Sequence, residues 1–341
     1  MKKALVLVLP IIFTAQACNF LFGELSGDEG SGVRGVFKSL DSGQTWAAIG
    51  KVGEKNLANA QVLNIFIEPA NANNLIASTF NAGVYASENS GENWVSLVPG
   101  FGAYVSIINP TNSQEIFVAG NRNRLPAILK SSDRGGSFVE VFSQPAAEGS
   151  VTSLIMDPKN SAILYASLTS GTLIKSLDGG VTWNVLTDFE DRVVRMRFSN
   201  DGRIIYALAK GEGLKKSEDA GRTWTMVILE NKANTYNDLV VDPQSSANLY
   251  MATDKGLFAS ADGGNTWTKL LLPATPEVNV ISTVAVNPKN NRQIFAVIRS
   301  TIYRSDDRGQ TWRTEPLLTN RVIAHIAIDP NEPNKIYIGL K

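Results

Sequence analysis

Apolar residues in this chain fall in short runs that are separated by polar turns. The runs "IFIEP", "LIMDP" and "IAIDP" each end in an acidic residue followed by proline, at Pro69, Pro158 and Pro330. A short polar turn and a second apolar run, such as "ILYAS" at 163–167, follow each of them. Short apolar runs bounded by Asx-Pro, Gly and Ser clusters are typical of β-strands. With 28 glycines and only 19% charged residues, the pattern predicts an all-β chain.

An eight-residue turn motif recurs along the chain, and we call it the octet. Its first copy is "SLDSGQTW" at 39–46, and copies follow at intervals of 41 to 48 residues. The seven copies begin at Ser39, Ser87, Ser131, Ser176, Ser217, Ser260 and Ser305. The third position is acidic or an amide, at Asp41, Asn89, Asp133, Asp178, Asp219, Asp262 and Asp307. The eighth position holds every tryptophan of the chain, namely Trp46, Trp94, Trp183, Trp224, Trp267 and Trp312, with Phe138 in the remaining copy.

One octet and one Asx-Pro turn alternate in each repeat, so that each repeat holds four short strands. This spacing predicts a seven-bladed β-propeller of four-stranded antiparallel blades over residues 33–341. The chain enters the repeats at an octet and leaves them with the strand pair "VIAHIAIDPNEPNKIYIGL" at 322–340. We therefore expect the last blade to be closed by N-terminal and C-terminal strands together, which leaves no free sheet edge.

The octet pattern Ser-x-Asp-x-Gly-x-Thr-Trp resembles the Asp-box, or BNR repeat. That repeat occurs in sialidases, xyloglucanases, sortilin-type receptors and photosystem II assembly factors. The resemblance covers nearly all of residues 33–341 and implies a propeller in which each box is a structural turn away from the ligand face. Asn89, Asn93 and Phe138 depart from the pattern, and these departures predict weaker turns in their two copies.

The first 32 residues carry a different pattern. Lys2 and Lys3 precede the apolar run "ALVLVLPIIFTA", and "AQAC" follows it, which is typical of a signal peptide at 1–17. "AQAC" also resembles a bacterial lipobox, which implies lipidation of Cys18, the only cysteine. Residues 18–32 then form a lipid-anchored flexible tether. An extracytoplasmic, membrane-anchored lipoprotein is expected. A secreted or periplasmic protein and an uncleaved anchor are the alternatives.

Charge and motifs exclude several classes of function. The chain carries 32 basic and 32 acidic residues and a single histidine. No basic block indicates nucleic acid as a partner, and no metal-ligand spacing or phosphate loop is present. We expect a monomer without metal or cofactor.

The innermost strand of each blade offers a candidate site. Five residues before each Asx-Pro proline, or before Asn200 in the blade that lacks one, lies a position that we call the column: Asn64, Val105, Ser153, Arg195, Asp238, Thr283 and His325. Innermost strands line the channel of a propeller, so a small anionic or carbohydrate ligand could bind at Arg195, Asp238 and His325, with Asn64 and Arg192 nearby. In the alternative interpretation these groups only hydrogen-bond one another and channel water.

Three classes of function follow, and one of them is an envelope protein whose propeller has only a structural role. The first is a non-enzymatic binding or assembly scaffold that holds a protein or an envelope glycan through the loop face, the face opposite the octets. The second is a sialidase- or xyloglucanase-like glycoside hydrolase, which needs two carboxylates at a defined separation. Glu190, Asp191 and Asp238 are candidates for that pair, but the short loops carry no recognisable catalytic motif, and no catalytic residue is assigned.

Overall fold

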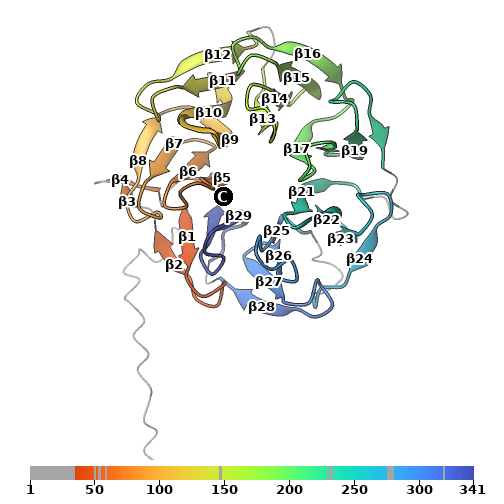
Figure 1. Ribbon diagram of the computed structural model, residues 1–341. Coiled ribbons are helices and arrows are strands. Elements are labelled where there is room, and N and C mark those ends of the chain that lie inside the picture. The colour runs from red at the N-terminus through yellow and green to blue at the C-terminus, as the bar shows by residue number, and fades with distance from the viewer. Residues whose placement is uncertain are drawn as a thin grey trace, which may run out of the picture. The chain divides into compact units, whose positions relative to one another are not determined.

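The strands of the computed structural model form seven four-stranded antiparallel sheets around a central axis (Figure 1). The structure describes residues 35–49, 51–52, 55–57, 60–145, 148–227, 229, 233–274, 280–317 and 319–341. The predicted all-β, seven-bladed propeller is therefore confirmed. We number the blades from β5–β8 as blade 1 to β25–β28 as blade 6, and β29, β30, β1 and β2 form blade 7.

Each blade is a meander whose strands run from the centre to the outside. The innermost strands are β5 (Val62–Ile67), β9 (Gly102–Asn109), β13 (Val151–Met156), β17 (Val193–Phe198), β21 (Tyr236–Asp242), β25 (Thr283–Val286) and β29 (Ile323–Ile328). The second strands are β6 (Leu75–Thr79), β10 (Asn112–Arg122), β14 (Leu164–Leu168), β18 (Ile205–Ala209), β22 (Ser245–Thr253), β26 (Ile294–Ile298) and β30 (Ile336–Leu340).

The outer half of each blade contains the octet. The third strands, which lead into the octets, are β7 (Gly83–Ser87), β11 (Leu125–Ser131), β15 (Thr172–Ser176), β19 (Gly213–Ser217), β23 (Gly256–Ser260), β27 (Thr301–Ser305) and β1 (Val36–Ser39). The outermost strands are β8 (Val95–Val98), β12 (Val139–Ser143), β16 (Asn184–Asp188), β20 (Thr225–Met226), β24 (Thr268–Leu270), β28 (Arg313–Pro316) and β2 (Ala47–Ile49). A small hairpin, β3 (Lys51–Val52) with β4 (Lys55–Asn56), lies between blades 7 and 1 in the chain.

Blade 7 closes the ring with strands from both ends of the propeller, as predicted. Its strand order is β2-β1-β30-β29. Strands β1 and β30 pair antiparallel from Val36 opposite Gly339 to Ser39 opposite Ile336. The closure joins the two ends through backbone hydrogen bonds, so no blade is left with an unpaired inner strand.

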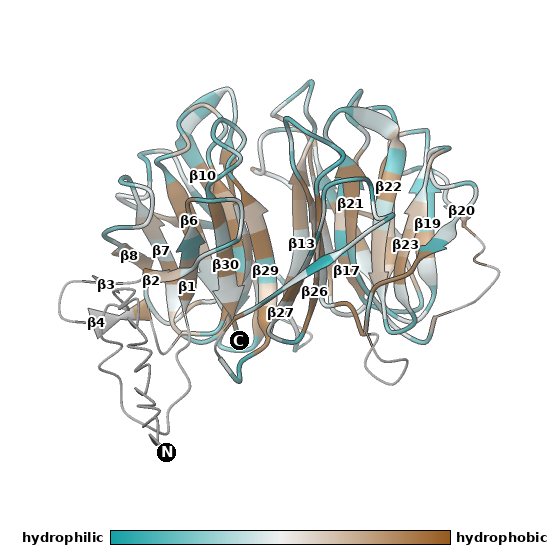
Figure 2. Cartoon of the chain, turned by 90° about the horizontal axis from the view of Figure 1, so that it is seen from below, coloured by the Kyte–Doolittle hydropathy of each residue, from teal (hydrophilic) through white to brown (hydrophobic). Residues whose placement is uncertain are grey.

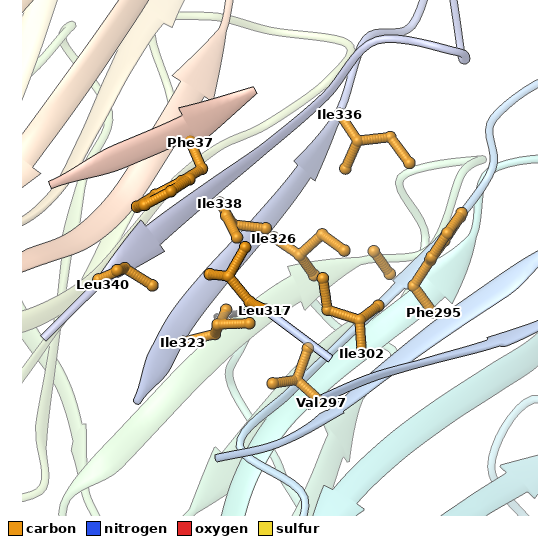
Figure 3. Close-up of a cluster of buried hydrophobic side chains, with 11 residues drawn as sticks. Phe37, Phe295, Val297, Ile302, Leu317, Ile323, Ile326, Ile336, Ile338 and Leu340 are labelled. Atoms are coloured by element: carbon orange, nitrogen blue, oxygen red, sulfur yellow. The ribbon is translucent and has the colours of Figure 1, made fainter. Parts of the chain in front are cut away.

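The core lies between blades rather than at the centre of the ring. Second strands such as Ile294–Ile298 are buried along their whole length, because each sheet is covered on both faces by its neighbours. Figure 2 shows that the strands are mostly hydrophobic and the connecting loops mostly hydrophilic. At the closure, Phe295, Val297 and Ile302 of blade 6 pack against isoleucines of β29 and β30 (Figure 3). Burial of these apolar faces is the main force that holds neighbouring blades together.

Each octet is a turn whose side chains form hydrogen bonds within the octet. In the copy at 176–183, the Ser176 hydroxyl donates to Asp178 Oδ1 and accepts from the Gly180 amide, both at 2.8 Å. The Thr182 amide and hydroxyl donate to the two oxygens of Asp178 at 2.8 and 2.6 Å. Trp183 Nε1 donates to the Gly180 carbonyl at 3.0 Å. The Thr182 hydroxyl and amide are the largest causes that lower the pKa of Asp178 to about 2.

The octet also touches the preceding blade. Gly180 has a φ of 84°, which glycine tolerates and other residues rarely adopt. A Cβ at this position would lie 2.8 Å from Cε1 of Phe117 in blade 2. In the copy at 87–94, Asn93 replaces the usual threonine, and Asn89 Oδ1 accepts from the Ser87 hydroxyl and the Asn93 amide at 3.0 and 2.9 Å. This copy therefore lacks the hydroxyl bond to a second carboxylate oxygen.

Some expectations are corrected and others lie outside the described residues. The stretch "GNRNRLP" at 120–126, which the sequence predicts to be a loop between the second and third strands of its blade, instead continues β10 and β11 around a two-residue turn. Asn123 and Arg124 both have positive φ, of 53° and 68°, which is the backbone of a type I′ hairpin. The signal peptide at 1–17, Cys18 and the tether at 18–32 are outside the described residues. Among the residues that are described, no helix has the length and apolar character needed to span a bilayer.

Candidate functional site

The Asx-Pro turns and the octets lie on the same face of the propeller. Within a blade, the octet amide donates to a carbonyl of the turn between the first and second strands. Gly179 donates to the Ala162 carbonyl at 2.8 Å, and Gly263 donates to the Ala247 carbonyl at 2.9 Å. We call this face the octet face. The opposite face, which we call the loop face, carries the connections between blades and those between second and third strands.

A cavity of about 670 Å³ occupies the part of the central channel nearer the octet face. All seven innermost strands line it, from the column residues to the turns that follow them. Its outer rim consists of the prolines of the Asx-Pro turns and Asn200: Pro69, Pro110, Pro158, Asn200, Pro243, Pro288 and Pro330. Four of the five predicted site residues line this cavity, namely Asn64, Arg195, Asp238 and His325. They lie at its inner end rather than at a mouth on the loop face.

Column side chains bind the next blade around the ring. In several blades the strand ladder shifts register just before the column position, as between Val193 and Arg195. Such bulges change the direction of the side chains that follow. Three column side chains accept hydrogen bonds from backbone amides of the next blade: Ser153 from Met196 at 3.0 Å, Asp238 from Val284 at 3.3 Å and His325 from Ile65 at 3.3 Å. The mutual hydrogen bonding of the alternative interpretation is thus present.

Asp238 forms the centre of a saturated network. Arg195 Nε donates to Asp238 Oδ1 at 2.8 Å, and the Thr283 hydroxyl donates to Oδ2 at 2.7 Å. The side chains of Arg195 and Asp238 are only 15% and 3% exposed. Burial by itself raises the pKa of Asp238, but the charges of Arg195 and Arg197 and the Thr283 hydroxyl lower it by more. The carboxylate therefore stays ionised and is fully engaged in holding blades 4, 5 and 6 together.

His325 is a neutral acceptor. Burial, followed by the charge of Arg195, lowers the pKa of His325 to about 3. The Ile65 amide donates to Nδ1, so the neutral ring carries its proton on Nε2, which lies 3.3 Å from the Asn64 carboxamide. The carboxamide atom at that distance is Asn64 Nδ2, and Oδ1 is the buried atom that has no hydrogen-bond partner among the described residues. Because Nε2–H needs an acceptor, exchange of the carboxamide nitrogen and oxygen would give the better hydrogen bond.

Arg197 also lines the cavity, although the predicted site did not include it. It lies two positions after Arg195, and side chains two residues apart on a strand share one side. Alternation from Arg195 was therefore the sequence signal that could have found it. Arg197 Nη1 donates to the Met196 carbonyl at 3.0 Å, and no carboxylate of the described residues lies within ion-pair distance of its guanidinium. Burial, with Arg195 as the next cause, lowers the pKa of Arg197 to about 10, so it is charged at neutral pH.

The remaining walls are mostly apolar, and Phe66, Ile107, Val240 and Ala285 are typical of them. Arg192, the fifth predicted site residue, does not line the cavity. Its backbone carbonyl accepts from the Lys210 amide at 2.9 Å at the loop-face end of β17. Glu190 and Asp191 lie in the same connection, away from the cavity lining. Among the described residues, no cluster of three or more His, Cys, Asp or Glu side chains could hold a metal ion.

Comparison with known proteins agrees with this architecture. The chain is a seven-bladed β-propeller whose octets resemble the Asp-box. A family model for Sortilin-Vps10 (sortilin, neurotensin receptor 3) matches residues 212–312, which run from blade 4 to the octet of blade 6. No curated protein matches the chain by sequence.

Two groups of solved structures share the fold. A GH74 xyloglucanase from Xanthomonas campestris has a TM-score of 0.70 at 18% identity, over 86% of this chain and 51% of that one. A GH74 enzyme from Niastella koreensis has a TM-score of 0.69 at 18% identity, over 89% and 52%. The chain thus spans about half the length of these enzymes. YCF48 bound to D1 peptide has a TM-score of 0.63 at 16% identity, over 83% of this chain and 92% of that one.

Proposed function

We propose that this protein is a non-enzymatic binding scaffold that holds a protein partner on the loop face of its propeller. The observation that carries the proposal is the state of Asp238, the only acidic residue of the predicted site. An ionised carboxylate that accepts bonds from Arg195, Thr283 and two backbone amides is a structural group. It has no proton to donate and no free lone pair with which to attack a substrate.

Exposed apolar side chains support a protein partner over a glycan. Phe80, Leu271 and Val280 lie in loop-face connections and are 45%, 78% and 51% exposed. Phe80 packs edge-on against Tyr104 of β9 with ring centroids 6.0 Å apart, which holds an aromatic anchor at the surface. Aromatic and aliphatic anchors of this kind dominate protein interfaces. The structure of YCF48 bound to D1 peptide provides a propeller of the same fold that binds a polypeptide.

The hydrolase alternative has less support. The xyloglucanases that share the fold are about twice as long as the part that this chain matches. The other acidic residue that lines the cavity is Asp157, and its Oδ1 accepts from the amides of its own turn at Lys159 and Asn160. The described cavity therefore offers no free pair of carboxylates for glycoside hydrolysis.

A site-specific photo-crosslinking experiment tests the proposal. Benzoylphenylalanine is placed at Phe80 on the loop face or at Leu177 on the octet face, which is 66% exposed, in full-length protein in its own membranes. We expect a discrete adduct from position 80 that forms again with the purified partner, and none from position 177. Adducts from position 177 alone would contradict the loop face. Turnover of glycosides or polysaccharides by the wild type, lost in Asp238→Asn, would overturn the scaffold.

We further propose that the protein is extracytoplasmic and is held at the membrane by a lipid on Cys18. The support is the sequence before Cys18 and the absence of any other cysteine in the chain. Labelling with radioactive palmitate, followed by fractionation, tests this. Wild type should carry the label and sediment with membranes, whereas Cys18→Ser should do neither. An unlabelled wild-type protein in the soluble fraction would contradict the anchor.

A further inference from the structure

The central cavity contains one cation that forms no ion pair among the described residues, and this cation is Arg197. Arg195 and Asp238 form an ion pair at 2.8 Å. His325 is neutral, because its Nδ1 accepts a backbone hydrogen bond within a buried site. Asp157 at the rim accepts hydrogen bonds from its own turn, and no ion pair joins it to Arg197 among the described residues. The formal charges of the lining sum to zero, and Arg197 is the cation that is left without an ion pair.

An isolated cation in an apolar cavity is costly for a protein. Transfer of an ion out of water costs several kcal/mol even after relaxation, unless a counter-charge or a set of hydrogen bonds compensates it. Among the described residues, the guanidinium of Arg197 donates one hydrogen bond, to the Met196 carbonyl, although a guanidinium has five N–H donors. Arg197 lines the cavity, and most of the other walls are apolar. An unpaired guanidinium in such a cavity is a candidate group for binding a ligand.

We propose that this cavity binds a small organic monoanion, with its carboxylate on Arg197 and its apolar body along the walls that include Phe66, Ile107 and Val240. A single carboxylate matches the one guanidinium of the lining that has no ion pair among the described residues. The volume of about 670 Å³ lies within the range of small-molecule sites, roughly 300 to 1,000 Å³. The proline rim places the entrance on the octet face, so this site is separate from the proposed protein surface on the loop face.

Titration calorimetry of the full-length protein with octanoate tests the site. Octylamine, with the opposite charge, and octanamide, with no charge, serve as matched probes. We expect saturable binding of one octanoate with a Kd of about 1 mM or tighter, and none of octylamine. Arg197→Met should weaken octanoate binding at least about tenfold, and Arg197→Lys, which keeps the charge without the planar fork, should fall between the two. Arg203→Met, with an 80% exposed side chain in the same blade, is the control and should bind as wild type.

A second readout does not depend on the probe. Since Arg197 is a partly buried charge without an ion pair among the described residues, Arg197→Met should raise the melting temperature of the ligand-free protein, and octanoate should raise that of the wild type only. Octanoate and octylamine binding equally, or octanoate binding unchanged in a folded Arg197→Met, would overturn the site. Loss of the Phe80 adduct bears only on the scaffold, because Arg197 does not contribute to the loop face.

Discussion

The octet turns and the column both occur once in every blade, but the octets repeat one chemistry while the column varies from blade to blade. The side-chain hydrogen bonds inside an octet join residues at most four apart, such as Ser176 and Gly180. Column bonds join residues 43 and 45 apart, as from Arg195 and Thr283 to Asp238. Repetition of a local turn makes the blades equivalent. Because the column residue differs from blade to blade, the charged column residues lie in one part of the ring. That part can bind a ligand that the other blades cannot bind.

Removal of the strands that close the ring should lower the stability of the protein most, because it disrupts both the octets and the column. A chain that ends at Asn320 lacks β29 and β30, and with them Ile326 and Ile338 of the core shared with blade 6. We expect no cooperative urea unfolding transition by tryptophan fluorescence. A chain that lacks only the exposed Lys341 should unfold as the full-length protein does. If the chain ending at Asn320 unfolded at the same midpoint, the ring would not depend on blade 7.

As the pH falls, the column and the octets should lose their contributions to stability at different pH values. The pKa of His325 is about 3 in the folded protein, and its ordinary value is 6.5. Between these two pH values the unfolded chain therefore binds a proton at His325 that the folded protein does not bind. The stability from neutral His325 is complete above pH 6.5 and is lost as the pH falls towards 3, by up to about 1.4 kcal/mol per pH unit.

The octets respond in a lower window. Their aspartates with a pKa of about 2 keep their contribution above the ordinary value of 3.8 and lose it only as the pH falls towards 2: Asp133, Asp178, Asp219, Asp262 and Asp307. Urea unfolding from pH 8 to pH 2.5 measures both windows. His325→Asn, whose amide oxygen can accept from Ile65, should flatten the profile between pH 6.5 and 4 only. The same slope in both proteins there would show that His325 does not titrate on unfolding.

A single octet glycine should matter through its contact with the neighbouring blade. Gly180→Ala forces a Cβ to within 2.8 Å of Phe117 at a positive φ, and we expect a loss of about 2 to 4 kcal/mol in urea unfolding. Gly100→Ala has a similar φ of 73° and nothing within 4 Å, so it isolates the backbone strain. Equal losses in the two variants would mean that the octet does not pack tightly on blade 2.

The smallest expected change is a gain in stability. Asn89→Asp combined with Asn93→Thr restores in blade 1 the carboxylate and hydroxyl that Asp178 and Thr182 share at 2.6 Å. The melting temperature should rise slightly at pH 7, and the gain should vanish below pH 2, where the new carboxylate is protonated. Asn81→Asp, in the exposed loop between β6 and β7, adds the same charge outside an octet and should not raise it. A decrease in the double variant would show that the departing copy is already adapted to its neighbours.

Much of the architecture follows from the sequence, because the interactions that specify it join residues that are close together in the chain. The bonds of an octet lie within eight residues, so Ser176, Asp178 and Gly180 specify their turn wherever the chain places it. Seven such turns at nearly constant spacing fix the number of blades, and the octet at Ser39 with the strand pair at 322–340 fixes the closure. The column was also visible as a set of positions, because strand alternation is local.

The role of the column residues could be determined only from the tertiary structure. Whether Arg195 faces a ligand or Asp238 depends on how far β17 and β21 are apart, and bulges shift the side chains in ways that residue types do not indicate. The face on which the cavity lies depends on the shape of the whole ring. Arg197 is one of 32 basic residues in a chain with 32 acidic ones, so its lack of a partner cannot be deduced from composition. Electrostatic pairing depends on distances between residues far apart in the chain, and only the closed ring sets those distances.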